Sequence, residues 1–324
     1  MDNQTERTSA GTIRWHLGAL AGIPAGVILF LAYRFAYDID IAHFRTGSVL
    51  FGAACALFAI GALCAVALWG QTRKRYSLAK APDNGKVGTF AALFAAVLYL
   101  TSSIRTTLAF DAPGKLEIAA TVLLVLPAAY LFCISLAPEK TAQAAPWLAF
   151  GGALSAIVQL FFQYFRAALP LNAPTRHLET LATIGMLLFF LTESRDRIGT
   201  GYATASFYAF ANGTAAVLCT GIGLAHAAFV LLGGQMTPDF APDPLWCAAL
   251  FGVGVLALCR ILRLPGLLCP YHAPYSPADE EKKKKEQKER AKKQAAENGS
   301  AKNADNPADS DRTGEAAASD ENRV

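Results

Sequence analysis

Long apolar stretches separated by short polar connections dominate residues 17–269 of this chain. Whole windows of the length that crosses a bilayer carry no charge, so neither the 3.6-residue period of an amphipathic helix nor the alternation of a half-buried strand describes them. About 20 apolar helical residues cross roughly 30 Å of hydrocarbon. The pattern predicts an all-α fold, a polytopic transmembrane helical bundle of about eight spans. We expect the spans near residues 15–36, 47–70, 87–105, 116–137, 145–168, 178–193, 204–233 and 244–263.

Polar segments flank the predicted transmembrane domain, which covers residues 15–269. Residues 1–14 form a short N-terminal segment, and residues 270–324 form a charged tail. Good helix formers with mixed charge at 279–297 predict a solvated helix in that tail. The segment that follows is too poor in apolar residues to fold alone, so we expect it to be disordered.

The Lys and Arg residues of the short connections set the expected orientation. An even number of spans places both termini on one side, and the connections on that side are the richer in basic residues. The run from Arg73 to Lys86 contributes most, and Arg260 and Arg263 lie beside the last span. The positive-inside rule therefore predicts a protein of the plasma (inner) membrane with both termini in the cytoplasm.

Composition refines this picture only slightly. The chain has 324 residues, is 53% hydrophobic and has a formal net charge of +4, with a mean hydropathy of +0.32. All of its 7 cysteines except Cys269 fall inside predicted spans, where a thiol behaves as a small apolar group. No disulfide framework is expected. The stretch that begins at Leu17 lacks a cleavage site, so we interpret it as a retained first span.

Three glycines recur at every fourth residue of the first predicted span, at Gly18, Gly22 and Gly26. They lie on one face of a helix, where a neighbouring helix can approach closely. Pro24 lies in the same stretch and should kink it. Packing within the chain is favoured over a dedicated dimer face, because such glycine patterns recur throughout helical bundles.

The fifth predicted span carries a polar stripe of Gln159, Gln163 and Arg166. Two amides and a guanidinium can bind a carboxylate or a phosphate. The simpler interpretation is that the glutamines bridge neighbouring helices while Arg166 extends to the membrane surface. That simpler interpretation is favoured.

The seventh predicted span carries Asn212 and His226, about four helical turns apart and so on one face. Together with Gln159, Gln163 and Arg166 they make a candidate polar cavity. A buried histidine can relay protons. We see no acidic partner at matching depth, however, so a hydrogen bond to a neighbouring helix is the favoured interpretation.

Three arginines, Arg34, Arg105 and Arg166, each end an odd-numbered span on the predicted outer side. If their helices are neighbours, the three guanidinium groups form an outer vestibule that attracts anions. Separate interfacial arginines beside an aromatic belt explain the same residues, and that interpretation is favoured.

Motifs for catalysis, metal binding and cofactor binding are missing from the sequence. There is no Walker loop, no HExxH and no Gly-x-Ser-x-Gly. We therefore predict no catalytic residue, no cofactor and no metal site, and an enzyme is disfavoured. We expect no nucleic-acid partner.

Two stretches, Tyr37 to Ser48 and Leu171 to Arg195, resemble segments of multi-pass bacterial membrane proteins that belong to uncharacterised families. The resemblance covers about a tenth of the chain. It implies a multi-pass membrane fold and carries no activity or residue role.

Two hypotheses for function remain. The first is a non-catalytic membrane scaffold or sensor, embedded in the lipid bilayer, whose cytoplasmic tail contacts anionic lipid or an acidic protein through residues 282–293. The alternative is a small-molecule transporter or permease that uses the polar faces of the fifth and seventh spans. The missing motifs favour the first by a small margin, and the oligomeric state stays open.

Overall fold

The computed structural model describes residues 14–38, 43–45, 47–73, 76–78, 84–108, 115–136, 143–165, 173–197, 205–234 and 243–270. The predictions for residues 1–13, and those for the tail beyond residue 270, lie outside the described residues. These include the charged helix at 279–297 and the basic run at 282–293.

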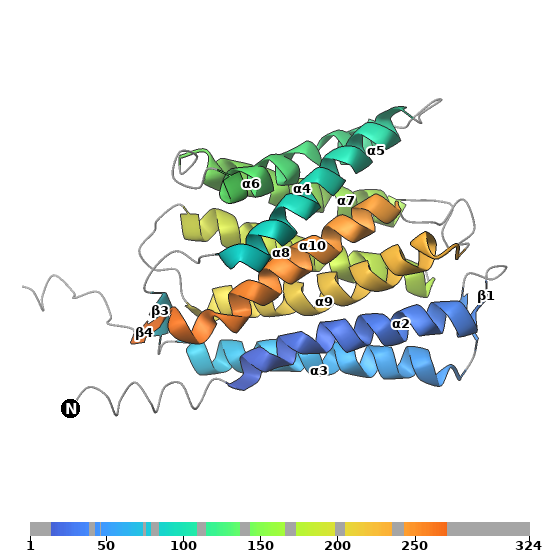
Figure 1. Cartoon of the computed structure of the whole chain (residues 1–324), viewed down its shortest axis with the longest axis horizontal. Helices are drawn as coiled ribbons and strands as arrows, with labels where there is room; N and C mark the ends of the chain where they lie inside the picture. Colours follow the sequence, from blue (N-terminus) through green and yellow to red (C-terminus); the bar gives the residue numbers. More distant parts are fainter. Residues whose placement is uncertain are drawn as a thin grey trace, which may run out of the picture. The chain divides into compact units, whose positions relative to one another are not determined.

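Helices dominate the described chain (Figure 1). In chain order the elements are η1 (Arg14–Ala21), α2 (Gly22–Ala36), β1 (Tyr37–Asp38), β2 (His43–Phe44), α3 (Val49–Thr72), β3 (Tyr76–Leu78), α4 (Gly85–Leu108), α5 (Lys115–Val122), α6 (Val125–Leu136), α7 (Ala145–Phe165), α8 (Pro174–Arg197), α9 (Ala205–Leu231), α10 (Pro244–Leu262), η2 (Leu264–Gly266) and β4 (Leu268–Pro270).

Seven helical stretches of the described chain are long and apolar enough to cross a membrane. They are Arg14–Ala36, Val49–Thr72, Gly85–Leu108, Lys115–Leu136, Ala145–Phe165, Ala205–Leu231 and Pro244–Leu262. The remaining long helix, α8, has 24 residues and packs against α7 and α9, but ionisable residues lower its hydropathy. At ~1.5 Å per residue it is roughly 36 Å long, which is enough to cross the hydrocarbon. The prediction of an all-α, polytopic transmembrane bundle of about eight spans is confirmed.

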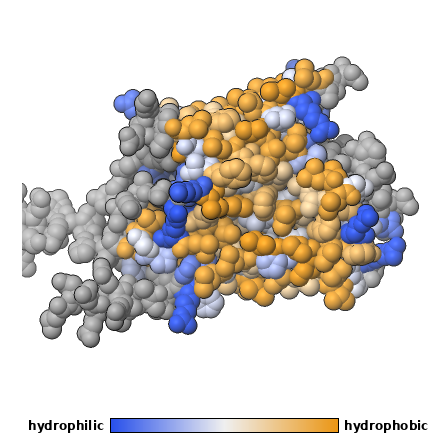
Figure 2. Space-filling view, viewed as in Figure 1, coloured by the Kyte–Doolittle hydropathy of each residue, from blue (hydrophilic) through white to orange (hydrophobic). Residues whose placement is uncertain are grey.

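The outer surface of the bundle is mostly apolar along the middle of its helices, unlike the surface of a protein that is surrounded by water (Figure 2). Figure 2 shows a continuous hydrophobic face along the middle of the helices, with hydrophilic residues gathered toward both ends. Large side chains such as Leu63, Phe90 and Trp147 are more than half exposed. So extensive an apolar surface is suited to lipid rather than to water. The protein is a multi-pass membrane protein.

Helix α9 is the central helix of the bundle. It packs against α2, α3, α8 and α10 and is buried along almost its whole length. Gly22 and Gly26 of the predicted glycine face lie against it, and a Cβ placed on Gly26 would lie 2.6 Å from the Gly221 carbonyl oxygen. Gly18 instead faces Cys64 of α3. The three glycines thus allow close helix contacts within the chain.

Two of the transmembrane stretches are interrupted near a proline. The first changes from the 3₁₀ helix η1 to α2 just before Pro24. The stretch predicted at 116–137 is broken at Leu123 and Leu124, between α5 and α6. Pro127 explains this break, because its ring clashes with the carbonyl of residue 123 and it has no N–H to donate there. Helix α9 is continuous through Gly221.

Short antiparallel strand pairs lie at the two ends of the bundle (Figure 1). Tyr37 pairs with Phe44 between β1 and β2, and Tyr76 pairs with Pro270 between β3 and β4. We name the two ends of the bundle after these pairs, the β1 end and the β3 end.

Candidate functional site

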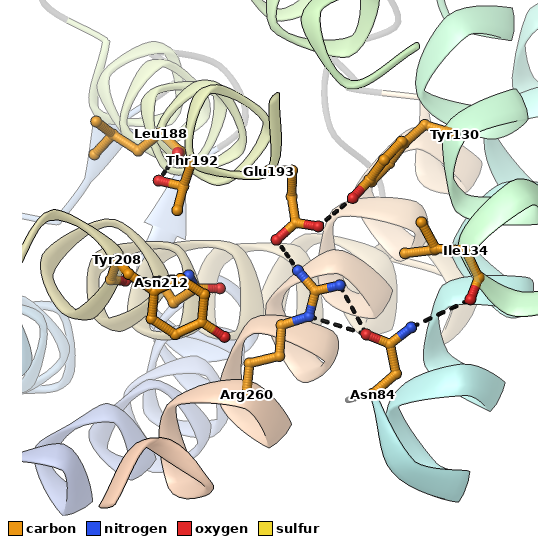
Figure 3. Close-up of polar contacts among 9 residues, drawn as sticks. All are labelled: Asn84, Tyr130, Ile134, Leu188, Thr192, Glu193, Tyr208, Asn212 and Arg260. Carbon is orange, nitrogen blue, oxygen red and sulfur yellow. Dashed lines mark hydrogen bonds and ion pairs between the residues drawn. The ribbon is translucent and has the colours of Figure 1, made fainter. Parts of the chain in front are cut away.

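A buried cluster of polar side chains lies toward the β3 end, and we call it the ion-pair cluster (Figure 3). Its members are Arg260 of α10, Glu193 of α8, Tyr130 of α6 and Asn84, which directly precedes α4. The Arg260 side chain is completely buried, and so is Tyr130. Four segments that are distant in sequence therefore meet around one guanidinium group.

Hydrogen bonds account for all three guanidinium nitrogens of Arg260. Nη1 donates to Glu193, while Nε and Nη2 donate to Asn84 Oδ1 over 3.0 and 2.7 Å. The second Glu193 oxygen accepts from the Tyr130 hydroxyl. The guanidinium carbon also lies 5.3 Å from the centre of the Phe189 ring, which adds a cation–π contact.

The backbone before α4 presents Asn84 to this cluster. Gly85 has φ of +62°, a left-handed conformation that glycine adopts without strain. The Asn84 amide nitrogen reaches the Ile134 carbonyl at 3.5 Å, while its oxygen faces Arg260. A positive and a negative charge are thus paired inside the protein, and the chemistry of the cluster is that of a structural tie between helices.

A second polar region, which we call the polar pocket, lies toward the β1 end. Helices α4, α5, α7, α8 and α10 supply its walls, with a volume of about 90 Å³. Its lining residues are Ser102, Thr106, Thr121, Leu124, Gln159, Phe162, Gln163, Glu179, Asp243 and Trp246. A cavity needs at least ~10–15 Å³ to hold one water molecule, so the polar pocket has room for several water molecules.

Amide and hydroxyl groups of the polar pocket are fixed by hydrogen bonds between helices. Gln159 Nε2 donates to the Ala120 carbonyl of α5 over 2.8 Å, and Gln163 Nε2 donates to Thr183 Oγ1 of α8 over 3.0 Å. These are the bridging bonds that the simpler interpretation of the stripe predicts. The two glutamines also line the polar pocket, so they both bridge helices and contribute polar groups to a cavity.

Two carboxyl groups give the polar pocket its electrostatic character. Glu179 is only 3% exposed. Asp243 caps α10 by accepting a hydrogen bond from Leu245 N over 3.2 Å, and it also accepts one from Ser102. Arg105 lies 3.8 Å from Asp243 with a side chain that is 63% exposed. The polar pocket is thus lined by one buried carboxyl group and one partly exposed carboxyl group, the second of which contacts the exposed Arg105, and we regard it as a candidate cation site.

The helix break is part of the polar pocket. Thr121, in the last turn of α5, and Leu124, within the break between α5 and α6, both line it. The Thr121 carbonyl accepts hydrogen bonds from Leu124 N over 3.2 Å and from Ser103 Oγ over 2.9 Å. Irregular backbone at membrane depth is tolerated where it is enclosed by protein or lines a cavity.

Asn212 and His226 of the predicted cavity lie elsewhere in the bundle. Asn212 is fully buried in α9 and donates to the Tyr208 carbonyl of its own helix over 3.1 Å. His226 Nε2 lies 2.6 Å from the Tyr33 hydroxyl of α2. Neither is among the residues that line the polar pocket, and Arg166 lies outside the described residues.

The contact between His226 and Tyr33 of α2 is the hydrogen bond to a neighbouring helix that we favoured for this histidine. Glu179, which lines the polar pocket, stands at the second position of the predicted sixth span, and we did not single it out from the sequence.

Two members of the predicted vestibule, Arg34 and Arg105, lie on helices that have different main packing partners. Helix α2 carries Arg34 and packs mainly on α3 and α9, whereas α4 carries Arg105 and packs mainly on α6 and α10. Arg105 is paired with Asp243, and Arg166 lies outside the described residues. The vestibule stays a prediction.

Sequence reasoning missed Asn84, Asp243, Trp246 and the burial of Arg260. For Asp243 a signal was available, because Asp followed by Pro marks the start of a helix. For Arg260 the signal was its place inside the predicted span 244–263, where a charge should attract attention. Comparison with known proteins adds no template for these residues, since no family model, no curated protein and no solved structure matches this chain.

Proposed function

We propose that this protein is a small-solute transporter of the membrane, and that the polar pocket is the site at which the solute first binds. The single observation that carries the proposal is a polar pocket, with carboxyl groups, built around an interrupted transmembrane helix. Secondary transporters place their substrate sites at discontinuous helices in this way.

The chemistry of the polar pocket favours a small cation with hydrogen-bond donors. Glu179 and Asp243 supply negative charge, and the glutamine and hydroxyl groups supply acceptors. The volume of about 90 Å³ is well below the ~300–1,000 Å³ of sites for drug-sized ligands. A solute of a few heavy atoms, such as a protonated primary amine, therefore matches both the charge and the size.

The position of the ion-pair cluster is consistent with a role in moving the solute through the protein. Helices α8 and α10 contribute residues both to the polar pocket and to the cluster. Helix α4 begins directly after Asn84 of the cluster and lines the pocket farther along, at Ser102 and Thr106. A shift of these helices on solute binding would act on the Arg260–Glu193 pair. Such a pair, buried between helices, can close one end of a bundle while the other end is accessible.

The experiment measures methylammonium binding and uptake by the full chain in proteoliposomes. We expect wild-type protein to bind and accumulate methylammonium, and Glu179→Gln to weaken binding at least about tenfold, equivalent to ~1.4 kcal/mol. Glu117→Gln is the matched control, because it makes the same change on α5 at a residue that does not line the polar pocket. Wild-type binding that does not depend on Glu179 would refute the assignment.

A sensor or scaffold is the second candidate, and the charged tail predicted at 282–293 favours it. Binding of methylammonium without uptake would support this candidate over transport.

Both candidates share the proposed orientation, with the β1 end outside, the β3 end in the cytoplasm and the protein in the plasma membrane. A reporter that is active only in the cytoplasm, fused after residue 324, tests that orientation.

A further inference from the structure

A large groove lies between α7 and α8 on the lipid-facing side of the bundle, separate from the polar pocket. Its volume is about 640 Å³, within the ~300–1,000 Å³ range of ligand sites. Ile157, Leu160 and Phe161 of α7 and Ile184 of α8 form its apolar part. In a membrane protein, acyl chains are the available occupants of such a surface.

The two ends of the groove differ in polarity. Arg176 and His177, in the first turn of α8, line the end nearest the β1 end, and Ile184 lies two helical turns deeper. Eight residues correspond to ~12 Å along a helix, close to the roughly 15 Å depth of one leaflet. The polar residues thus lie at the height of lipid head groups when the apolar part lies among the acyl chains.

The charge at the polar end suits an anion. Arg176 is buried against α7, where its guanidinium donates to the Tyr164 carbonyl and lies 6.0 Å from the centre of the Tyr164 ring. This arrangement fixes the positive charge at the mouth of the groove. The dipole of α8 adds positive potential at its N-terminus. Glu179, the nearest carboxyl along α8, lines the polar pocket and not the groove.

We propose that the α7–α8 groove binds one anionic phospholipid, with its phosphate beside Arg176 and His177 and an acyl chain along Ile157, Leu160 and Ile184. The cationic end of the groove matches the phosphate of such a lipid, and the long apolar wall matches its acyl chain. Exposed Phe161 is placed to pack along the same chain. This site is independent of the solute proposed for the polar pocket.

Native mass spectrometry of the full chain tests the proposal. The protein is released from vesicles of phosphatidylcholine mixed with phosphatidylglycerol, and the phospholipids that remain bound are identified. We expect one retained phosphatidylglycerol per chain, in preference to phosphatidylcholine. Arg176→Gln, which keeps a donor for the Tyr164 carbonyl, should reduce that preference about tenfold.

A second variant protects the test against loss of folding, because Arg176 also joins α7 to α8. Ile184→Trp fills the apolar part of the groove and should displace both lipids while Arg176 is intact. Arg73→Gln is the matched control, since Arg73 lies over Trp69 at 5.2 Å at the other end of the bundle, and it should leave retention unchanged. Retention of phosphatidylglycerol by both groove variants would overturn the proposal. The proposal would also be overturned if the protein formed a stable dimer that bound phosphatidylglycerol only after the two chains had dissociated.

Discussion

Breaking the Arg260–Glu193 pair should destabilise the bundle more than any exposed ion pair does. Arg260 is fully buried and all three of its guanidinium nitrogens donate hydrogen bonds. In Glu193→Gln the guanidinium keeps Asn84 as an acceptor but loses its counter-charge. Removing one partner of a buried pair costs ~3–5 kcal/mol. We take the lower end, about 3 kcal/mol, because the amide oxygen of Gln can still accept one hydrogen bond.

The double variant separates pairing from simple loss of contacts. Arg260→Met alone leaves the Glu193 carboxyl buried with Tyr130 as its partner, so it should also cost about 3 kcal/mol. In Arg260→Met/Glu193→Gln no unpaired charge remains. We therefore expect the double variant to cost about 3 kcal/mol in total, well below the sum of the two single variants.

Reversible unfolding in mixed micelles, followed by circular dichroism, measures these free energies. The matched comparison is Arg105→Gln, which breaks the 3.8 Å contact with Asp243, where the Arg105 side chain is 63% exposed. An exposed pair contributes at most ~1 kcal/mol. The reasoning fails if Arg260→Met is no more destabilising than Arg105→Gln. It also fails if the costs of the two single variants simply add.

Two further predictions concern close contacts in the middle of the bundle. Gly26→Ala places a Cβ 2.6 Å from the Gly221 carbonyl oxygen and should lower the free energy of unfolding by ~1–3 kcal/mol. Gly52→Ala, whose Cβ would have no atom within 4 Å, should be neutral or slightly stabilising. Equal effects of the two variants in the micelle assay would contradict this prediction. Tyr33→Phe removes the hydroxyl that lies 2.6 Å from His226 Nε2 and should cost ~1–3 kcal/mol. The double variant Tyr33→Phe/His226→Phe should recover part of that loss, and an additive result would show that the pair is not coupled.

The helices were predictable because the bilayer fixes how long an apolar stretch must be. Every helix that crosses the bundle lies at one of the stretches expected from hydropathy. The break in the stretch 116–137 was within reach of the sequence, since Pro127 is an internal proline that removes a helix hydrogen bond. We predicted one continuous span there and did not take Pro127 into account.

The partners of the polar groups were much harder to predict. Arg260 and Glu193 each stand near a helix end, where a charge is normally solvated, and their pairing depends on α8 and α10 lying side by side. Gln159 and Gln163 were correctly identified as polar groups inside a span, but the sequence could not reveal that Glu179 of another helix lines the same pocket. Hydropathy locates helices along the chain and says nothing about which of them are neighbours.

The central position of α9 has a consequence for how the protein is made. Helices α2 and α3 emerge from the ribosome long before α9, yet their glycine face and Phe58 contact residues of α9 near Gly221. Until α9 has been synthesised, those surfaces face lipid or an insertion chaperone. A nascent chain arrested before residue 205 should therefore be captured by membrane quality control, although most of its transmembrane stretches are already inserted.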